Sequence, residues 1–564
     1  MKKMITIIAL LLALTLVLCS CGAGSGSGSE AALTEKTTVS ETQSSSGETK
    51  DENSASGAES ASQSPQTGSS EQSSAESEYF SNKDYRIEYK DSESAHISLS
   101  GFSASADSNA VSVNGSTVTI SDEGTYVVSG ELEGMIIVDA EKTDKVQIVL
   151  SGVSINSETS AAIYVKQADK VFITTAEGTV NTLTNGGSFV AIDDNNIDAV
   201  IFSKDDLTLN GAGTLDISSP AGHAVVSKDE LTVTSGTYVL SSASSTLAGK
   251  DNVCIAGGDF TITSVKDGIH SENDDDSTLG FIYIMGGSFD ITAGDDGIYA
   301  GAYILIDGGD FTITSADDAV HSNASVTVNG GSFTINAGDD GMHADEDMTV
   351  NAGTINIAKS YEGIEGLNVY INGGDIYVKA SDDGINAAGG TDQSGFGGSG
   401  QDMFGGRGNK MGGQGGFGGM SSGNSTLVIS GGNIHINANG DGIDANGSFS
   451  MTGGYVIVCG PTQGDTSVLD FDATGSITGG TFIGSGASMM AQSFSSSEQG
   501  VISLSVGSRS AGTEISVSDA SGNTVLSYTP ELPYQIVILS SEDLVSGQSY
   551  TVNIGSQSAS VTAN

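Results

Sequence analysis

The sequence predicts an all-β protein that folds as a right-handed parallel β-helix with about 22 residues per repeat. A glycine-containing turn followed by a short run of alternating apolar residues recurs along the chain, starting at Gly257, Gly286, Gly308, Gly330, Ala352, Gly373, Gly431 and Gly453. Five of the seven steps between these starts are 21 or 22 residues long. A period of this length with three short strands per repeat is typical of a β-helix, whose repeats stack about 4.8 Å apart.

Two further observations support this fold. The second and fourth residues after each glycine pair are apolar, as in Phe260 and Ile262 or Phe311 and Ile313. Because side chains alternate faces along a strand, we expect these residues to form inward-pointing ladders. The chain also has 78 Gly, 5 Pro and no Trp, which indicates many turns between β-rich runs. Leucine-rich repeats need an LxxLxL skeleton and calcium-binding nonapeptide rolls repeat every nine residues, so neither rival fits.

The first 20 residues predict a secretory signal peptide, because two lysines precede an apolar run. The run ends in LCSC, in which Cys21 fits a bacterial lipobox better than Cys19 does. We therefore expect lipidation of Cys21 and anchoring to the outer face of the bacterial cell membrane, with an ordinary cleaved signal as the alternative. Residues 21–80 are rich in Ser, Gly and Glu and predict a disordered tether.

The rest of the chain divides into three predicted parts. An N-terminal β cap region with the first repeats covers residues 81–196, the main β-helix covers 197–497, and a small C-terminal β segment covers 498–564. The step of 58 residues between Gly373 and Gly431 contains a Gly-, Met- and Phe-rich insertion at 389–424. This insertion is either a tolerated surface loop or a lid over a ligand groove. Cys254 and Cys459 lie in apolar runs and are expected to be buried thiols.

The charge balance narrows the range of partners. With 20 basic and 70 acidic residues, the chain lacks the clustered Lys and Arg that grip a phosphate backbone, so we expect no nucleic-acid partner. The same charge disfavours direct capture of any polyanion. A polyanionic ligand would need bridging metal ions, which an acidic surface attracts.

An acidic residue stands two positions before one apolar residue of each repeat. We call these seven residues the acidic column: Asp267, Asp296, Asp318, Asp340, Glu362, Asp383 and Asp441. Four repeats carry a second carboxylate directly before it: Asp295, Asp317, Asp339 and Asp382. The residue between the column and the apolar position is Gly in six repeats and Ala319 in one, which indicates a need for small size more than for positive φ.

The residue that follows the apolar position forms a second column. We call it the flanking column and predict that it contributes to ligand binding; its members are His270, Tyr299, His321, His343, Glu365, Asn386 and Asp444. Stacked carboxylates about 4.8 Å apart repel by roughly 3 to 4 kcal/mol per pair at an effective dielectric near 20. We therefore predict Ca²⁺ as the counterion, with the acidic residues as its ligands. A merely solvated acidic ladder and a transition-metal site are the alternatives.

The segment from Val118 to Leu183, VTISDEGTYVVSGELEGMIIVDAEKTDKVQIVLSGVSINSETSAAIYVKQADKVFITTAEGTVNTL, is followed by repeats of the GDDGI type. Together they resemble the clostridial β-helix carbohydrate-binding lipoproteins, which bind cellulose and acidic sugars such as polygalacturonate. The resemblance covers about residues 85–555. It implies a pectate-lyase-like fold and calcium bound by acidic residues of the turns. Two repeats depart from the motif, one with Lys266 and one with Tyr361 and Glu362.

These observations favour a non-catalytic, monomeric surface protein that binds an acidic, pectin-like polysaccharide through calcium. Cellulose is a second ligand candidate, for which Tyr299, Tyr361 and Tyr377 are the available aromatic platforms. A calcium-dependent polysaccharide lyase is the main alternative, with Lys266 or Lys359 as its base. A salt-bridge role for these lysines is the simpler interpretation. An adhesin or structural spacer is the third hypothesis.

Overall fold

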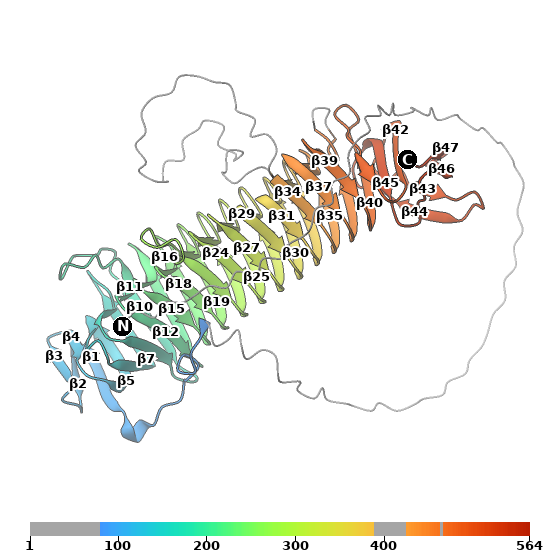
Figure 1. Ribbon diagram of the computed structural model, residues 1–564. Helices are drawn as coiled ribbons and strands as arrows, with labels where there is room; N and C mark the ends of the chain where they lie inside the picture. Colours follow the sequence, from blue (N-terminus) through green and yellow to red (C-terminus); the bar gives the residue numbers. More distant parts are fainter. Residues whose placement is uncertain (1–78, 388–424, 463–465) are drawn as a thin grey trace, which may run out of the picture.

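The computed structural model describes residues 79–387, 425–462 and 466–564 (Figure 1). The predicted signal peptide, Cys21, nearly all of the predicted tether and the 389–424 insertion lie outside the described residues. Within the described ranges the chain forms strands and one short 3-10 helix, η1 (Asp91–Glu93), which confirms the all-β class. No helix in this part of the chain is long and apolar enough to cross a membrane.

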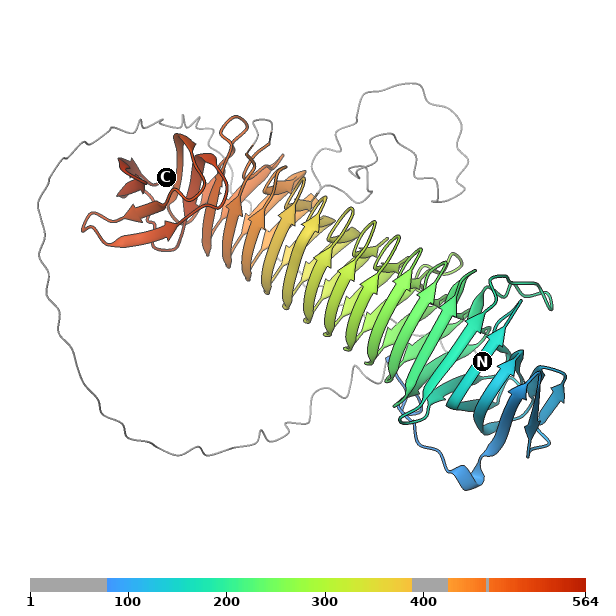
Figure 2. The same ribbon diagram turned by 180° about the vertical axis from the view of Figure 1, so that it is seen from behind.

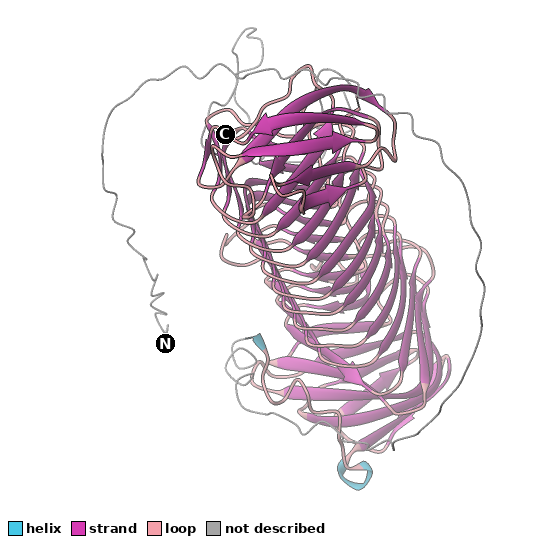
Figure 3. Cartoon of the chain, turned by 90° about the vertical axis from the view of Figure 1, so that its right-hand side faces the viewer, coloured by secondary structure: helices cyan, strands magenta, loops and turns pink. Residues whose placement is uncertain are grey.

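One sheet of 43 mostly parallel strands forms the elongated body (Figures 1 and 2). Most strands pair with the strand three further along the chain, so that each repeat of three strands lies directly on the next (Figure 3). The registers pair Asp259 with Ser288, Ser288 with Asp310 and Asp310 with Ser332. These are the offsets that the glycine-rich turns predicted.

The repeats form three rows of strands. Row 1 contains β4 (Thr117–Ile120), β6 (Met135–Asp139), β8 (Ile163–Gln167), β11 (Ala199–Ser203), β14 (His223–Ser227), β17 (Leu247–Gly249), β20 (Ile269–Ser271), β23 (Ile298–Ala300), β26 (Val320–Ser322), the first parts of β29 (Met342–Val350) and β31 (Ile364–Ile371), β33 (Ile385–Ala387) and β36 (Ile443–Ala445).

Row 2 contains the first parts of β5 (Gly124–Glu133) and β7 (Lys145–Ser157), then β9 (Lys170–Thr175), β12 (Asp206–Gly211), β15 (Glu230–Val233), β18 (Asn252–Ile255), β21 (Phe281–Ile284), β24 (Tyr303–Ile306), β27 (Ser325–Val328), the later parts of β29 and β31, β34 (Ser425–Ile429), β37 (Gly447–Met451), β39 (Thr474–Ile477) and β41 (Ser496–Ser497).

Row 3 contains the later parts of β5 and β7, then β10 (Val180–Asn185), β13 (Thr214–Ser219), β16 (Thr237–Ser242), β19 (Asp259–Ser264), β22 (Ser288–Thr292), β25 (Asp310–Thr314), β28 (Ser332–Asn336), β30 (Thr354–Ser360), β32 (Asp375–Ala380), β35 (Asn433–Asn437), β38 (Tyr455–Cys459) and β40 (Thr481–Gly486).

Shorter elements close the two ends. At the N-terminal end lie β1 (Ala95–Gly101), β2 (Ser103–Ala106) and β3 (Val111–Asn114). At the C-terminal end β45 (Tyr534–Ser540) pairs antiparallel with β40 and with β42 (Val501–Arg509). A separate four-stranded antiparallel sheet is formed by β43 (Ile515–Ser518), β44 (Thr524–Tyr528), β46 (Ser549–Ile554) and β47 (Gln557–Thr562).

The predicted apolar ladder fills the interior. The rings of Phe260, Phe289, Phe311 and Phe333 are buried and stack with centroid separations of 4.8, 4.7 and 4.5 Å. Tyr238 extends this ladder towards the N-terminus, 4.9 Å from Phe260. Dispersion contacts between such stacked rings stabilise the stack of repeats at the spacing of neighbouring strands. Cys254 and Cys459 are free, buried thiols, as predicted.

The glycines beside the acidic column are constrained by space, which confirms the inference from Ala319. A Cβ added to Gly341 would lie 2.5 Å from the carbonyl oxygen of Gly363 and 2.6 Å from Ile357 Cδ1. In contrast, the second glycine of the pair at Gly286 requires positive φ, since Gly287 has φ 126°. The acidic turns therefore lie as close to one another as the backbone allows.

Replacing one of these glycines should test this constraint. We expect Gly341→Ala to lower the free energy of unfolding by about 1–3 kcal/mol, because the added methyl group must displace backbone of the next repeat. The control is Gly257→Ala, where the new Cβ would meet only Thr234 O, at 3.6 Å. Denaturant titration of both variants measures the difference. Equal stability of the two variants would contradict the steric explanation.

Candidate functional site

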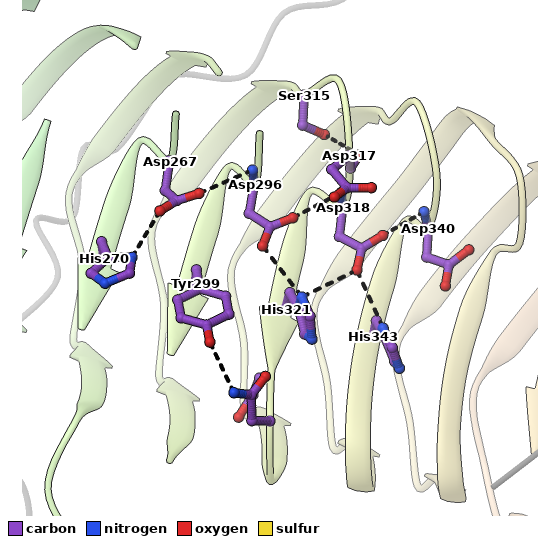
Figure 4. A network of polar contacts seen from close by, with 12 residues as sticks. Asp267, His270, Asp296, Tyr299, Ser315, Asp317, Asp318, His321, Asp340 and His343 are labelled. Atoms are coloured by element: carbon purple, nitrogen blue, oxygen red, sulfur yellow. Dashed lines mark hydrogen bonds and ion pairs between the residues drawn. The ribbon is translucent and has the colours of Figure 1, made fainter. Parts of the chain in front are cut away.

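The acidic column lies in the turn that leads from row 3 to row 1 (Figure 4). Asp267, Asp296, Asp318, Asp340 and Glu362 are buried, while Asp383 and Asp441 are half-buried. Each is followed by a small residue and then by an inward-pointing apolar residue that begins the row 1 strand. Because the small residues let neighbouring turns stack closely, the turns shield the carboxylates from water. This burial differs from the solvated ladder that was one of the sequence-based alternatives.

In most column residues one carboxylate oxygen accepts a hydrogen bond from the backbone of the next repeat. Asp296 N–H donates to Asp267 Oδ1 at 3.4 Å, Asp318 N–H to Asp296 Oδ1 at 3.0 Å, and Asp340 N–H to Asp318 Oδ1 at 2.7 Å. Glu362 N–H continues the series to Asp340 Oδ1 at 3.1 Å. A buried backbone N–H needs an acceptor, so the column has a structural role that is independent of any ligand.

The second oxygen faces histidines of the flanking column in the first half of the stack. His270 Nδ1 lies 2.7 Å from Asp267 Oδ2, and His321 Nδ1 lies 3.3 Å from Asp296 Oδ2 (Figure 4). His343 Nδ1 lies 3.3 Å from Asp318 Oδ2. Burial alone would lower the pKa of His321, but the hydrogen bond that His321 donates to Asp296 and the charges of Asp318 and Asp296 outweigh it and raise that pKa to about 10. His321 is therefore a cation at neutral pH and offsets part of the stacked negative charge.

Carboxylates from Asp340 onward are surrounded mainly by other carboxylates. Burial and the charges of Asp318 and Asp339 raise the pKa of Asp340 to about 7. Burial, the charge of Glu362 and a hydrogen bond with Asp340 raise the pKa of Glu365 to about 11. Glu365 thus carries a proton at neutral pH, which it shares with Asp340. Oxygen and nitrogen atoms of Asp340, His343 and Glu365 lie within 4.8 Å of one another.

A second cluster joins the two stacked repeats that flank the insertion in the sequence. Carboxylate oxygens of Asp383, Asp441 and Asp444 lie within 4.8 Å of one another. Burial, followed by the charges of Glu362, Asp441 and Asp444, raises the pKa of Asp383 to about 9. Burial and the charge of Asp441 raise the pKa of Asp444 to about 7. Negative charge thus gathers here to an extent that protons or a cation must offset.

The second carboxylates of the pairs differ in position. Asp317 is exposed, Asp295 and Asp382 are half-buried, and Asp339 is buried. The structure brings carboxylate oxygens of Asp317, Asp318 and Asp339 within 4.8 Å of one another as a third cluster, the second that consists of carboxylates alone. Ligand atoms of a fourth group, Asp318, His321 and His343, also lie within 4.8 Å of one another, and two of these residues contribute imidazole nitrogens.

The rest of the flanking column divides into rings and amides. Tyr299 stacks on His270 with ring centroids 5.0 Å apart, and its hydroxyl accepts a hydrogen bond from Asn323 Nδ2 at 2.8 Å. Asn386 is buried and donates from Nδ2 to Glu362 Oε2 at 2.7 Å. The half-exposed rings of His270, Tyr299 and His321 therefore form one edge of the acidic column.

Sequence reasoning missed one participant and the column's hydrogen-bonding role. Ser245 Oγ donates to Asp267 Oδ2 at 3.0 Å, so the column begins one repeat earlier than its acidic members do. Ser245 stands two positions before Leu247, which pairs with Ile269 in the register of row 1. Extending the repeat alignment by one step towards the N-terminus would have found it.

Comparison with known proteins identifies the family. A family model described as carbohydrate-binding domain-containing protein matches residues 114–363 and 326–400. Together these matches span residues 114–400, which are 287 of the 564 residues. The chain belongs to this family.

Two individual proteins are similar to parts of the chain. A carbohydrate-binding domain-containing protein of Acetivibrio thermocellus is 36% identical over 129 residues, which cover 22% of this chain and 45% of that protein. The chain thus spans less than half the length of this relative. A solved structure described as a polysaccharide lyase-like protein from C. thermocellum, gadolinium derivative, matches with a TM-score of 0.39 and 30% identity over 46% of this chain and 96% of that one.

Proposed function

We propose that this protein is a right-handed parallel β-helix that holds an acidic, pectin-like polysaccharide on a calcium-bearing acidic column, without catalysis. The right-handed winding is favoured because parallel strands joined by a crossover connection are right-handed in nearly all proteins. The single observation that carries the proposal is the burial of stacked carboxylates whose pKa values are raised, beside half-exposed rings, in a chain of the carbohydrate-binding family.

Calcium suits two of the four clusters by the chemistry of their donors. Asp383, Asp441 and Asp444 offer only carboxylate oxygens, and so do Asp317, Asp318 and Asp339. Ca²⁺ takes six to eight oxygen ligands in irregular geometry, whereas imidazole-rich sets favour zinc and other transition metals. The two clusters that contain His343 are better explained by the ion pairs between histidine and aspartate.

An acidic polysaccharide fits this surface through the metal. Three protein carboxylates leave a bound Ca²⁺ with open coordination positions that uronate carboxylates of the ligand can fill. The stacked rings of His270 and Tyr299 lie beside the column and offer an apolar surface to the sugar rings. Cellulose, the second ligand candidate, carries no carboxylate and would depend on the rings alone.

The lyase alternative depends on Lys266 and Lys359, both of which are exposed. The charge of Lys266 acts on Asp295, where it opposes the rise in pKa that burial and the neighbouring aspartates cause. This is the effect of a lysine that relieves repulsion between carboxylates. β-Elimination would need a base, a metal and a stabiliser of the developing negative charge to converge on one sugar.

One assay separates binding from catalysis. With polygalacturonate and excess Ca²⁺, the purified protein should be retained on the polymer and should release no unsaturated product that absorbs in the ultraviolet. Asp383→Asn should weaken retention, while Asp290→Asn, which changes an exposed aspartate on row 3, should not. Steady product formation that is abolished by Lys266→Ala or Lys359→Ala would replace this proposal with the lyase. If the protein is not retained and forms no product, only the structural-spacer hypothesis remains.

Surface attachment is a separate part of the proposal. Replacing Cys21 with alanine should release the protein into the medium, because a diacylated cysteine supplies the two acyl chains that stable anchoring needs. Fractionation of cells that express wild-type and Cys21→Ala proteins measures the distribution. Membrane association that survives the substitution would refute the lipid anchor, whereas Cys19→Ala serves as the control and should leave the anchor intact.

A further inference from the structure

A cavity of about 360 Å³ lies at the N-terminal end of row 2, away from the acidic column. Three basic side chains line it, Lys83, Arg86 and Lys145, together with Thr125, Gln147 and Phe172. The whole chain has 20 basic residues among 564, so three among the eight residues of one cavity are a local reversal of the overall charge. Its volume falls within the range of small-molecule sites.

The wall that carries Lys83 and Arg86 is fixed by a buried anchor. Asp84 is 2% exposed; its Oδ1 lies 2.9 Å from Lys170 Nζ and accepts from Thr208 Oγ1 at 2.6 Å. The backbone oxygen of Asp84 accepts from Asn210 Nδ2 at 2.9 Å and from Thr234 Oγ1 at 2.8 Å. The backbone N–H of Arg86 donates to the carbonyl oxygen of Lys83 at 3.1 Å and closes a turn, which places both cationic side chains beside the cavity. The arm is thus held in place before any ligand arrives.

The floor of the cavity is equally fixed. Phe172 and Gln147 are each 7% exposed, and Gln147 is held between Thr125 Oγ1 and Thr174 Oγ1, each at 3.1 Å. Lys145 pairs with Asp169 at the surface, where side-chain exposures of 36% and 42% leave the lysine accessible. A buried aromatic ring below cationic and amide groups is the arrangement that a charged sugar needs, since the ring packs on C–H groups while the cations bind the carboxylate.

We propose that this cavity is a calcium-independent subsite for a single carboxylate-bearing sugar unit, which Arg86, Lys83 and Lys145 recognise by its negative charge. The inference rests on the proposed function, because it takes the ligand to be an acidic polysaccharide. The overall charge of −50 disfavours direct capture of a polyanion by the protein as a whole, but the basic side chains of this cavity allow it locally. Glu123 at the same cavity accepts hydrogen bonds from sugar hydroxyl groups and sets an orientation for the unit.

The test removes calcium so that only this subsite remains. Binding of a short oligogalacturonate to the full chain is measured by calorimetry in excess chelator, beside a neutral glucose oligomer of equal length. We expect binding of the acidic oligomer alone. The double substitution Arg86→Gln and Lys145→Gln should raise Kd about tenfold or more, since both charged hydrogen bonds to the carboxylate are lost.

The matched control is Lys166→Gln. Lys166 pairs with Asp139 at 2.7 Å and has a similar exposure, 43%, but it does not line the cavity. Equal weakening by this control, equal binding of the neutral oligomer, or no binding in chelator would each overturn the subsite. Inorganic sulfate that binds as tightly as the oligomer would reduce the cavity to a general anion site and overturn the sugar assignment. Loss of binding only in chelator leaves the calcium-dependent function standing, so the two proposals fail separately.

Discussion

Removal of calcium should lower the thermal midpoint of this protein by on the order of 5–10 °C at pH 8, because a cation that binds only the folded state stabilises it by mass action. The two all-carboxylate clusters are the reason for a large effect. Without a cation, Asp383, Asp441 and Asp444 must either hold protons or repel one another within 4.8 Å in a partly dehydrated turn. Differential scanning calorimetry with chelator, and then with Ca²⁺ restored, measures the difference.

Matched variants show whether the cluster is responsible. Asp383→Asn removes one charge but keeps an oxygen that can accept from Asp441 N–H, which lies 2.5 Å from Asp383 Oδ1. This variant should lose much of the calcium-dependent shift and gain stability in chelator. Asp290→Asn removes an exposed charge from row 3 and should leave the shift unchanged. A midpoint that does not respond to chelator in the wild-type protein would refute the calcium sites.

The repeat could be read from the sequence because its signals are local. The glycine pairs, the Phe and Ile positions and the acidic turn recur at one spacing, and the registers of β19, β22, β25 and β28 reproduce that spacing. The glycine-pair pattern does not include the two repeats before Gly257, although β13 stacks on β16 and β16 on β19 in the same register. Their turns contain Gly213 and Gly236 without a glycine pair, so they lack the most regular feature of the repeat.

The environment of the acidic residues could not be predicted in the same way. Whether Asp318 is solvated or buried depends on how closely the neighbouring turns stack, and that distance is set by backbone contacts such as Gly341 against Gly363. Two turns with the same charged residues but different stacking distances would therefore have carboxylates with widely different pKa values.

The basic cavity illustrates the same limit. Arg86 belongs to an arm outside the repeats and Lys145 to β7, so only the fold brings them together. The anchor that fixes the arm is also non-local, because Asp84 pairs with Lys170 and with threonines of later repeats. A net charge describes the average field and gives no information about such local exceptions.

In chelator, the stability of the protein should fall as pH rises from 5 to 8.5, by on the order of 5 °C in midpoint. Asp340 and Asp444 have pKa values raised from 3.8 to about 7, and Asp383 to about 9. The folded state thus binds protons at pH values where the unfolded chain has lost them, and each group destabilises the fold increasingly between its unfolded and folded pKa. His321 acts in the same direction, since its pKa is raised from 6.5 to about 10 and its stabilising charge is lost as pH rises through that range.

Calcium should flatten this pH dependence, because a bound cation stabilises the carboxylates in their charged form and takes the place of the protons. The chelator effect should therefore be larger at pH 8.5 than at pH 5. Asp267 does not disturb the comparison: burial alone would raise its pKa, but the hydrogen bond and charge of His270 lower it below the usual value of 3.8, so its contribution changes only at more acidic pH. Thermal midpoints at three pH values, with and without Ca²⁺, measure the two slopes. A midpoint in chelator that rises with pH would show that the column carries its negative charge without penalty, and the physical argument for a bound cation would then fail.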